Sequence, residues 1–184
     1  MKPARKEITR KEIKKEAIPA CAVLFIATSE LGVHEKKWQA AWLAMPASYR
    51  CVPVNSLLAA DDCLRQETFH LVVFEDEWIV QQPTLTLNWV QTHLNLALVV
   101  LGQSRLGVRA WMAELGAQEC LLKQEVSASL LRDVFQQALI RKQLEIRLRE
   151  TQDELAIKGV QLETLAYTDA LTALGNRFFF YQSC

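Results

Sequence analysis

Three charged residues and one glycine stand directly after apolar stretches of strand length. Glu75 and Asp76 follow HLVVF, Gly102 follows LALVVL, and Lys123 follows CLL. In an open sheet of parallel strands, binding sites lie at the carboxyl ends of the strands, so these residues form the candidate site. Carboxylates can hold magnesium, and a lysine can neutralise a carboxylate.

The stretches that would position these residues alternate between strand and helix patterns. Continuous apolar runs at 21–27, 49–54, 70–74, 96–101 and 120–122 predict strands buried on both faces. Amphipathic spacing predicts helices over 34–45, with Trp38 and Trp42 facing the core, and over 56–67 and 108–115, the last ended by Gly116. The segment 77–90 contains Pro83 and is ambiguous. We predict an α/β fold, a flavodoxin-like, doubly wound, five-stranded parallel sheet.

Two segments, HLVVFEDE and GAQECLLK, resemble the third and fifth strands of response-regulator receiver domains, and the resemblance covers about residues 20–139. It implies two acids after the first strand that hold magnesium and an aspartate that accepts a phosphoryl group. It also implies a hydroxyl after the fourth strand and a lysine after the fifth. Here Glu30 is the only acid near the first position, Glu75 replaces the aspartate, and Gly102 replaces the hydroxyl residue. Only Lys123 matches, which predicts a pseudo-receiver that keeps the fold without the phosphorylation chemistry.

The role of Lys123 is open at this stage. It either pairs with Glu75, as a permanent mimic of the activated pairing, or only maintains a structural contact. A third hypothesis shifts the register by one residue, so that Asp76 becomes the phosphoacceptor. Ser104 would then have to supply the hydroxyl that Gly102 lacks.

A long helix is predicted from Ser127 to Tyr167, because no proline interrupts this segment and Gly159 is its only glycine. Thr151 and Lys158 interrupt its heptad pattern. The remaining heptad positions form a predicted seam for a parallel homodimer: Leu144, Leu148, Leu155, Leu162 and Leu165. The alternative, a helix folded back on its own sheet, fits only 127–139.

The segment after this helix resembles the TDxLTGLxNR motif that opens GGDEF domains, the diguanylate cyclase family. The matched residues are Thr168, Asp169, Leu171, Thr172, Leu174, Asn176 and Arg177. The family's catalytic acids would follow after Cys184, so the resemblance implies a truncated domain start, no catalytic residue and no enzyme activity for these 184 residues. A natural stop, a frameshift and the boundary of a fragment all remain open.

Composition excludes several classes of function. Basic and acidic residues number 21 each, so no overall charge favours nucleic acid or membrane as a partner. Five cysteines without a CxxC pair predict reduced, buried thiols, and three scattered histidines predict no metal site. Seven basic and three acidic side chains in the first 16 residues do not resemble a secretory signal. We predict a cytoplasmic protein without a cofactor.

The predicted organisation has four parts: a charged leader at 1–19, the pseudo-receiver at 20–126, a signalling coiled coil at 127–167, and the GGDEF start at 168–184. The predicted function is a regulatory and dimerisation fragment of a diguanylate cyclase-type protein in cyclic di-GMP signalling. Two alternatives are a stand-alone protein-interaction module with a vestigial cyclase remnant, and a phosphorylatable response regulator that uses Asp76.

Overall fold

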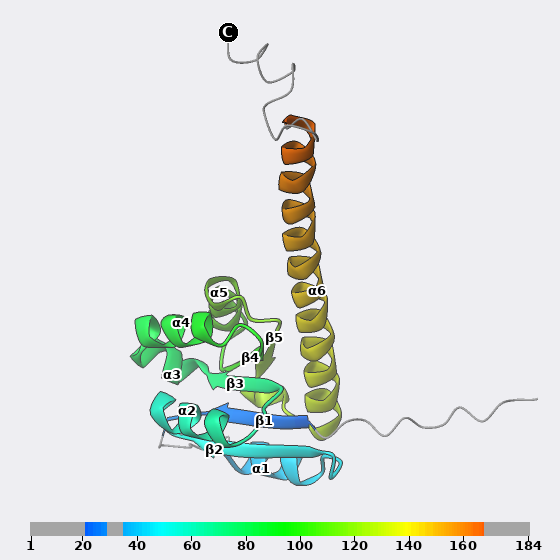
Figure 1. Cartoon of the computed structure of the whole chain (residues 1–184). Coiled ribbons are helices and arrows are strands. Elements are labelled where there is room, and N and C mark those ends of the chain that lie inside the picture. Colours follow the sequence, from blue (N-terminus) through cyan, green and yellow to red (C-terminus); the bar gives the residue numbers. More distant parts are fainter. Residues whose placement is uncertain (1–20, 29–34, 168–184) are drawn as a thin grey trace, which may run out of the picture.

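Five parallel strands form the centre of the molecule. The computed structural model describes residues 21–28 and 35–167 (Figure 1). The strands are β1 (Cys21–Ile26), β2 (Tyr49–Val54), β3 (Leu71–Glu75), β4 (Ala97–Gly102) and β5 (Glu119–Leu122), in the order β2-β1-β3-β4-β5. Every residue of β1, β3 and β4 is buried, as expected for strands covered on both faces. The predicted flavodoxin-like sheet is confirmed.

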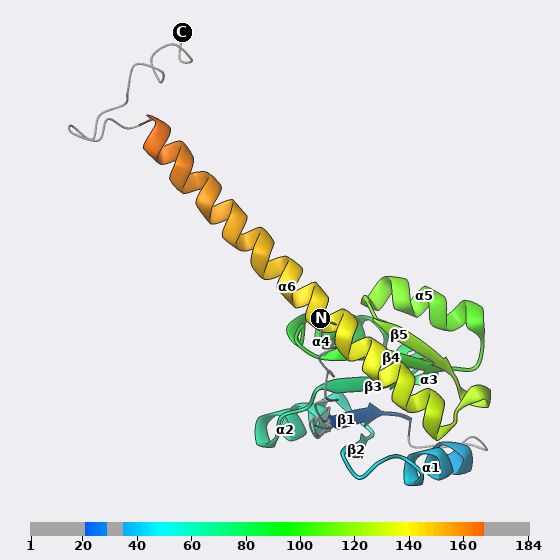
Figure 2. The ribbon, with the colours of Figure 1, turned by 90° about the vertical axis from the view of Figure 1, so that its right-hand side faces the viewer.

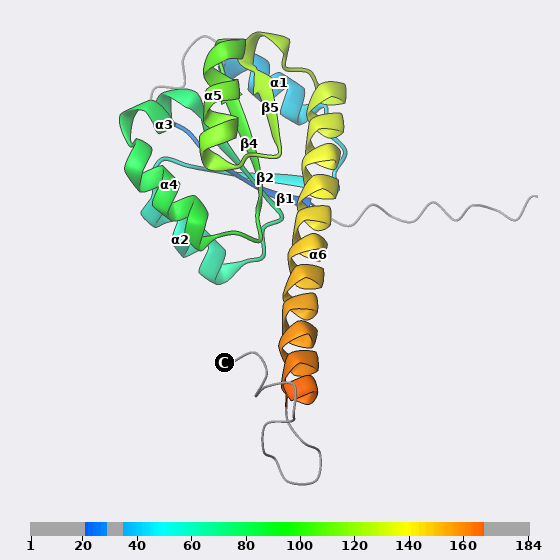
Figure 3. The same ribbon diagram turned by 90° about the horizontal axis from the view of Figure 1, so that it is seen from above.

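Helices cover both faces of this sheet (Figure 3). One face packs against α1 (Glu35–Leu43) and the first part of α6 (Ala128–Tyr167). The other packs against α2 (Leu57–Gln66), α3 (Asp76–Gln81), α4 (Pro83–Thr92) and α5 (Arg105–Leu115). A short 3₁₀ turn, η1 (Lys123–Glu125), joins β5 to α6.

Aromatic side chains fill the core on the α1 and α6 face. Trp38 stacks on Phe25 with ring centroids 4.6 Å apart, and Trp42 lies next in the row, 5.9 Å from Trp38 and 6.0 Å from Phe135. Trp38 and Phe135 are buried and Trp42 is half-buried. The prediction that both tryptophans belong to the core is confirmed.

Local sequence signals explain where several helices begin and end. Pro83 stands at the first position of α4, where its missing N–H costs nothing, and so the ambiguous segment 77–90 divides into α3 and α4. The hydroxyl of Ser104 accepts the N–H of Gly107 at 3.0 Å, which makes α5 begin three residues before the predicted start. Gly116 ends α5 in the left-handed region, at φ 66°.

The cysteines are less buried than predicted. Cys21 is buried, whereas Cys51, Cys63 and Cys120 are half-buried because they lie near the margins of the sheet and on α2. All four are free thiols. Desolvation by burial raises the pKa of Cys21 to about 11 and that of Cys51 to about 12, so these thiols are unreactive at neutral pH.

The last helix, α6, runs without interruption for 40 residues, or about 60 Å, and its C-terminal half projects beyond the domain (Figures 1 and 2). The sheet buries Leu131, Phe135 and Ala138, whereas Leu148 and Leu155 are 60% and 63% exposed. The predicted helix is therefore present, and the alternative of a helix folded back over the sheet holds only for its first part. None of the helices described here is long and apolar enough to cross a membrane.

Candidate functional site

A buried ion pair lies at the carboxyl ends of β3 and β5. Lys123, the first residue after β5, places its Nζ 2.8 Å from Oε1 of Glu75, the last residue of β3. Both side chains are 8% exposed. The other carboxylate oxygen of Glu75 accepts the main-chain N–H of Thr28 at 3.3 Å. The pairing of Lys123 with Glu75 that the sequence left open is thus present.

A second carboxylate, from Glu77, also binds Lys123. The Nζ of Lys123 donates to Oε2 of Glu77, and the side-chain amide of Gln103 donates to Oε1 of Glu77 at 2.7 Å. The helix α3 starts at Asp76, directly after β3, and this turn brings Glu77 back toward the end of β5. We did not identify Glu77 or Gln103 from the sequence. Glu77 lies in α3, where the alternation of a strand no longer applies, and Gln103 lies between β4 and α5, outside any regular pattern.

The third carboxylate, Asp76, lies against the end of β4. Its Oδ2 accepts the main-chain N–H of Gln103 at 3.0 Å, and its Oδ1 is buried without a hydrogen-bond partner. A Cβ atom on Gly102 would lie 2.4 Å from both Asp76 Oδ2 and a methyl carbon of Val108. Glycine at position 102 therefore makes the space that the Asp76 carboxylate occupies.

The charges in this cluster shift several pKa values. Burial, helped by a hydrogen bond to Glu77, raises the pKa of Asp76 to about 6. Burial opposes the ionisation of Glu77, but hydrogen bonds from Asp76 and Lys123 outweigh it and lower the pKa of Glu77 to about 2. Burial alone would lower the pKa of Lys123, and the carboxylates of Glu75 and Glu77 reverse this and raise it. Below about pH 6 the pair of Asp76 and Glu77 therefore holds one proton, on Asp76, beside a lysine that stays charged.

The described residues of the cluster do not fit a magnesium ion. Lys123 already pairs with both Glu75 and Glu77, and its ammonium lies between the carboxylates that would be ligands. Within residues 21–28 and 35–167, no three side chains of His, Cys, Asp or Glu are arranged to hold a metal. Glu30, the one acid near the first strand, lies outside the described residues.

The other predicted site residues fall in different places. Ser104 does not reach back into the cluster, because its hydroxyl caps α5. The seam leucines Leu144, Leu148, Leu155 and Leu162 are 58–67% exposed along α6. The side chain of Leu165 and the whole GGDEF-like motif, Thr168 to Arg177, lie outside the described residues.

Comparison with known proteins reveals the fold and little more. No protein-family model matches the chain, and no curated protein matches its sequence. The signal receiver domain of an HD domain-containing protein from Pseudomonas fluorescens Pf-5 is similar in structure, with a TM-score of 0.53 and 20% identity over 70% of this chain and 93% of that one. This likeness, together with the all-parallel sheet, shows a receiver-like fold followed by a long helix.

Two further solved structures are similar. A fusion protein that contains the yeast Spc42 trimeric coiled coil (amino acids 181–211) has a TM-score of 0.52 and 16% identity over 78% of this chain and 95% of that one. The Legionella pneumophila response regulator LqsR has a TM-score of 0.44 and 14% identity over 71% of this chain and 50% of that one.

Proposed function

We propose that this chain is a regulatory and dimerisation module of a diguanylate cyclase-type signalling protein, and that its receiver-like domain works without phosphorylation. The GGDEF-like motif at 168–177 links the module to cyclic di-GMP signalling. In this proposal the domain holds one fixed state, and α6 brings two copies together. The chain itself performs no catalysis.

The observation that carries the proposal is the cluster of Lys123 with three carboxylates. A phosphoryl group brings negatively charged oxygens to a lysine and to main-chain N–H groups at the ends of strands. Here Glu75 and Glu77 already bind Lys123, and Asp76 already accepts the N–H of Gln103. The chain's own carboxylates take the contacts that an added phosphoryl group would need.

The same geometry argues against Asp76 as a phosphoacceptor. Its Oδ1 is buried, and its Oδ2 already accepts the main-chain N–H of Gln103, so one oxygen is enclosed and the other is already engaged. Phosphorylation of Asp76 would also bring additional negative charge beside Glu77, whose carboxylate is already ionised.

The leucine spacing of α6 favours a parallel dimer over an antiparallel one. In a parallel pair each position meets its own copy, so every seam leucine packs against a leucine. In an antiparallel pair that aligns Leu144 with Leu162, Leu148 meets Lys158 and Leu155 meets Thr151. Burying a leucine fully is worth about 1.5–3 kcal/mol, so the parallel arrangement gains several such contributions. Thr151 and Lys158 weaken the seam but help to define its register.

The test combines beryllofluoride, which mimics a bound phosphoryl group, with sedimentation. We expect the full chain to sediment as a concentration-dependent dimer, with the same affinity with or without magnesium and beryllofluoride. A working receiver domain serves as the positive control for the reagent. Acetyl phosphate should add no mass to this chain.

Two results would contradict the proposal. A mass increase of one phosphate that disappears in Asp76→Asn would support the phosphorylatable regulator instead. A chain that stays monomeric at high micromolar concentration would exclude dimerisation through α6 and leave the stand-alone interaction module.

A further inference from the structure

The side chain of Gln118 connects the sheet to α6. Gln118 precedes β5, is 7% exposed, and its Oε1 accepts the main-chain N–H of Leu98 at 2.7 Å. Its Nε2 donates to the carbonyl of Gly116 at 3.1 Å and to Oε2 of Glu145 at 2.9 Å. Both amide hydrogens and the amide oxygen are thus used, as a buried amide requires.

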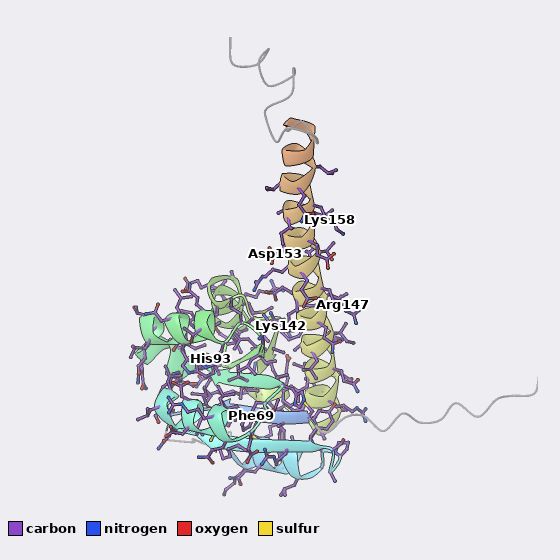
Figure 4. The ribbon with its side chains drawn as sticks, in the orientation of Figure 1. Phe69, His93, Lys142, Arg147, Asp153 and Lys158 are labelled. Atoms are coloured by element: carbon purple, nitrogen blue, oxygen red, sulfur yellow. The ribbon has the colours of Figure 1, made fainter. Side chains whose placement is uncertain are left out.

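On α6, the partners of Gln118 lie one helical turn apart. The guanidinium of Arg141 donates to the main-chain carbonyl of Gln118 at 2.9 Å and also lies 3.0 Å from Oε1 of Glu119. Glu145 receives the Gln118 amide, and the buried Lys142 places its Nζ 3.1 Å from the same carboxylate. Figure 4 shows Lys142 beside the domain, whereas Asp153 and Lys158 lie beyond it. This junction is therefore at the end of the docked part of α6, where exposure begins.

These contacts constrain the helix in a way that its apolar contacts do not. Leu131, Phe135 and Ala138 bury area, which is non-directional, whereas hydrogen bonds depend on distance and angle. At 3.6 residues per turn, the seam around Leu144 points roughly 130° away from the docked side of the helix. A rotation of α6 on the sheet, or a shift by one turn of about 5.4 Å, would break the contacts of Arg141 and Glu145 together.

We propose that Gln118 is a positioning residue that holds α6 at one rotation and one height on the sheet, and so determines where the dimer seam faces relative to the domain. The effect on the dimer seam rests on the proposed dimerisation, whereas the positioning of α6 by Gln118 takes place within one chain. It also gives the turn between α5 and β5 a direct connection to the helix.

The experiment uses the full chain in a monomeric background, Leu148→Asp with Leu155→Asp, so that dimer contacts cannot hold the helix. In this background, Glu145→Ala removes the helix-side acceptor and leaves the sheet contacts of Gln118 in place. Glu150→Ala is the matched control, because it makes the same change on the exposed part of the same helix. Residual dipolar couplings measure the angle between α6 and the sheet, and hydrogen exchange measures protection of the Gln118 side-chain amide.

We expect Glu145→Ala to change the couplings of residues 146–162 relative to those of the sheet. The Gln118 side-chain amide should also exchange at least tenfold faster, while Glu150→Ala leaves both unchanged. A residue that contributes only to stability would lower the unfolding midpoint without changing the helix angle.

A second arm reverses the direction of the hydrogen bond. Gln118→Glu places two carboxylates face to face and should displace the helix, whereas adding Glu145→Gln restores a donor and should return the couplings toward those of the parent.

Three results would overturn the inference: a helix angle in Glu145→Ala equal to that in Glu150→Ala, protection of the Gln118 amide that is unchanged, or no restoration in the double variant. Sedimentation of the chain with its natural seam tests dimerisation separately. Failure of one proposal is therefore distinguishable from failure of the other.

Discussion

Replacing Lys123 with methionine gives the sharpest test of the carboxylate cluster. The variant keeps an unbranched side chain up to the Cε position and removes the ammonium that Glu75 and Glu77 share. Glu75 would then stay buried with the N–H of Thr28, at 3.3 Å, as its remaining hydrogen-bond donor in the described structure. Breaking a buried pair in this way costs about 3–5 kcal/mol, which is a large part of the stability of an ordinary domain.

Equilibrium unfolding in urea at pH 7, followed by circular dichroism in the monomeric background, measures this loss. With a slope of about 2 kcal/mol per molar urea, the midpoint should fall by about 2 M. The double variant Lys123→Met with Glu75→Leu removes both buried charges and should recover most of the loss. Glu77 is more exposed than Glu75 and can turn toward water in either variant.

The matched control is Arg105→Met, which removes the cation of a surface pair with Glu125. These partners lie 2.7 Å apart, but the Arg105 side chain is 73% exposed, so water screens their interaction. We expect a loss below about 1 kcal/mol. If Lys123→Met shifts the midpoint no more than Arg105→Met, the ion pair with Glu75 does not hold the fold together, and the explanation given for the site is wrong.

Three further predictions concern the same cluster and the long helix. The folded-state pKa of Asp76 is about 6, above its ordinary value of 3.8, so the folded protein binds this proton more tightly than the unfolded chain does. The free energy of unfolding should therefore fall by about 1–2 kcal/mol as the pH rises from about 4 to 6. Urea titrations across this range should show that fall in the parent chain but not in Asp76→Asn. Gly102→Ala should lower the free energy of unfolding by about 1–3 kcal/mol, because the added carbon overpacks the end of β4. Gly159→Ala should stabilise α6 by up to about 1 kcal/mol, because nothing lies within 4 Å of the added carbon. Thermal melts of the two variants measure both effects. Leu148→Asp with Leu155→Asp should sediment as a folded monomer. If this variant is still a dimer, the interface does not lie along the leucine seam of α6.

Sequence patterns predicted the fold well because each pattern has one simple physical cause. The run CAVLFI can only be stabilised as a strand by cover on both faces, and all six of its residues are buried. Gly116 ends a helix because the left-handed conformation costs glycine little, and it does so here. Pro83 was harder to interpret, since a proline either breaks a helix or begins one, and local sequence does not decide between these outcomes.

The candidate site was only partly predictable, because its contacts depend on where a strand ends. Asp76 does not continue β3 but is already the first residue of α3, and the helical turn keeps both Asp76 and Glu77 in the cluster. Gln118 carried no sequence signal that we identified, since its role depends on Glu145, 27 positions later. Polar contacts between residues so far apart in the sequence produce no periodic pattern from which they could be predicted.

The continuity of α6 gives the molecule a mechanical property. From Glu145 to Tyr167 the helix extends about 33 Å without proline, beyond its last contacts with the sheet. A rigid rod of this length acts as a lever arm, whose fulcrum is the turn that carries Gln118. A tilt of about 10° there would displace the far end by roughly 6 Å, close to the rise of one helical turn. A change too small to alter the sheet could therefore become a displacement of the order of a side chain at the start of whatever follows the helix.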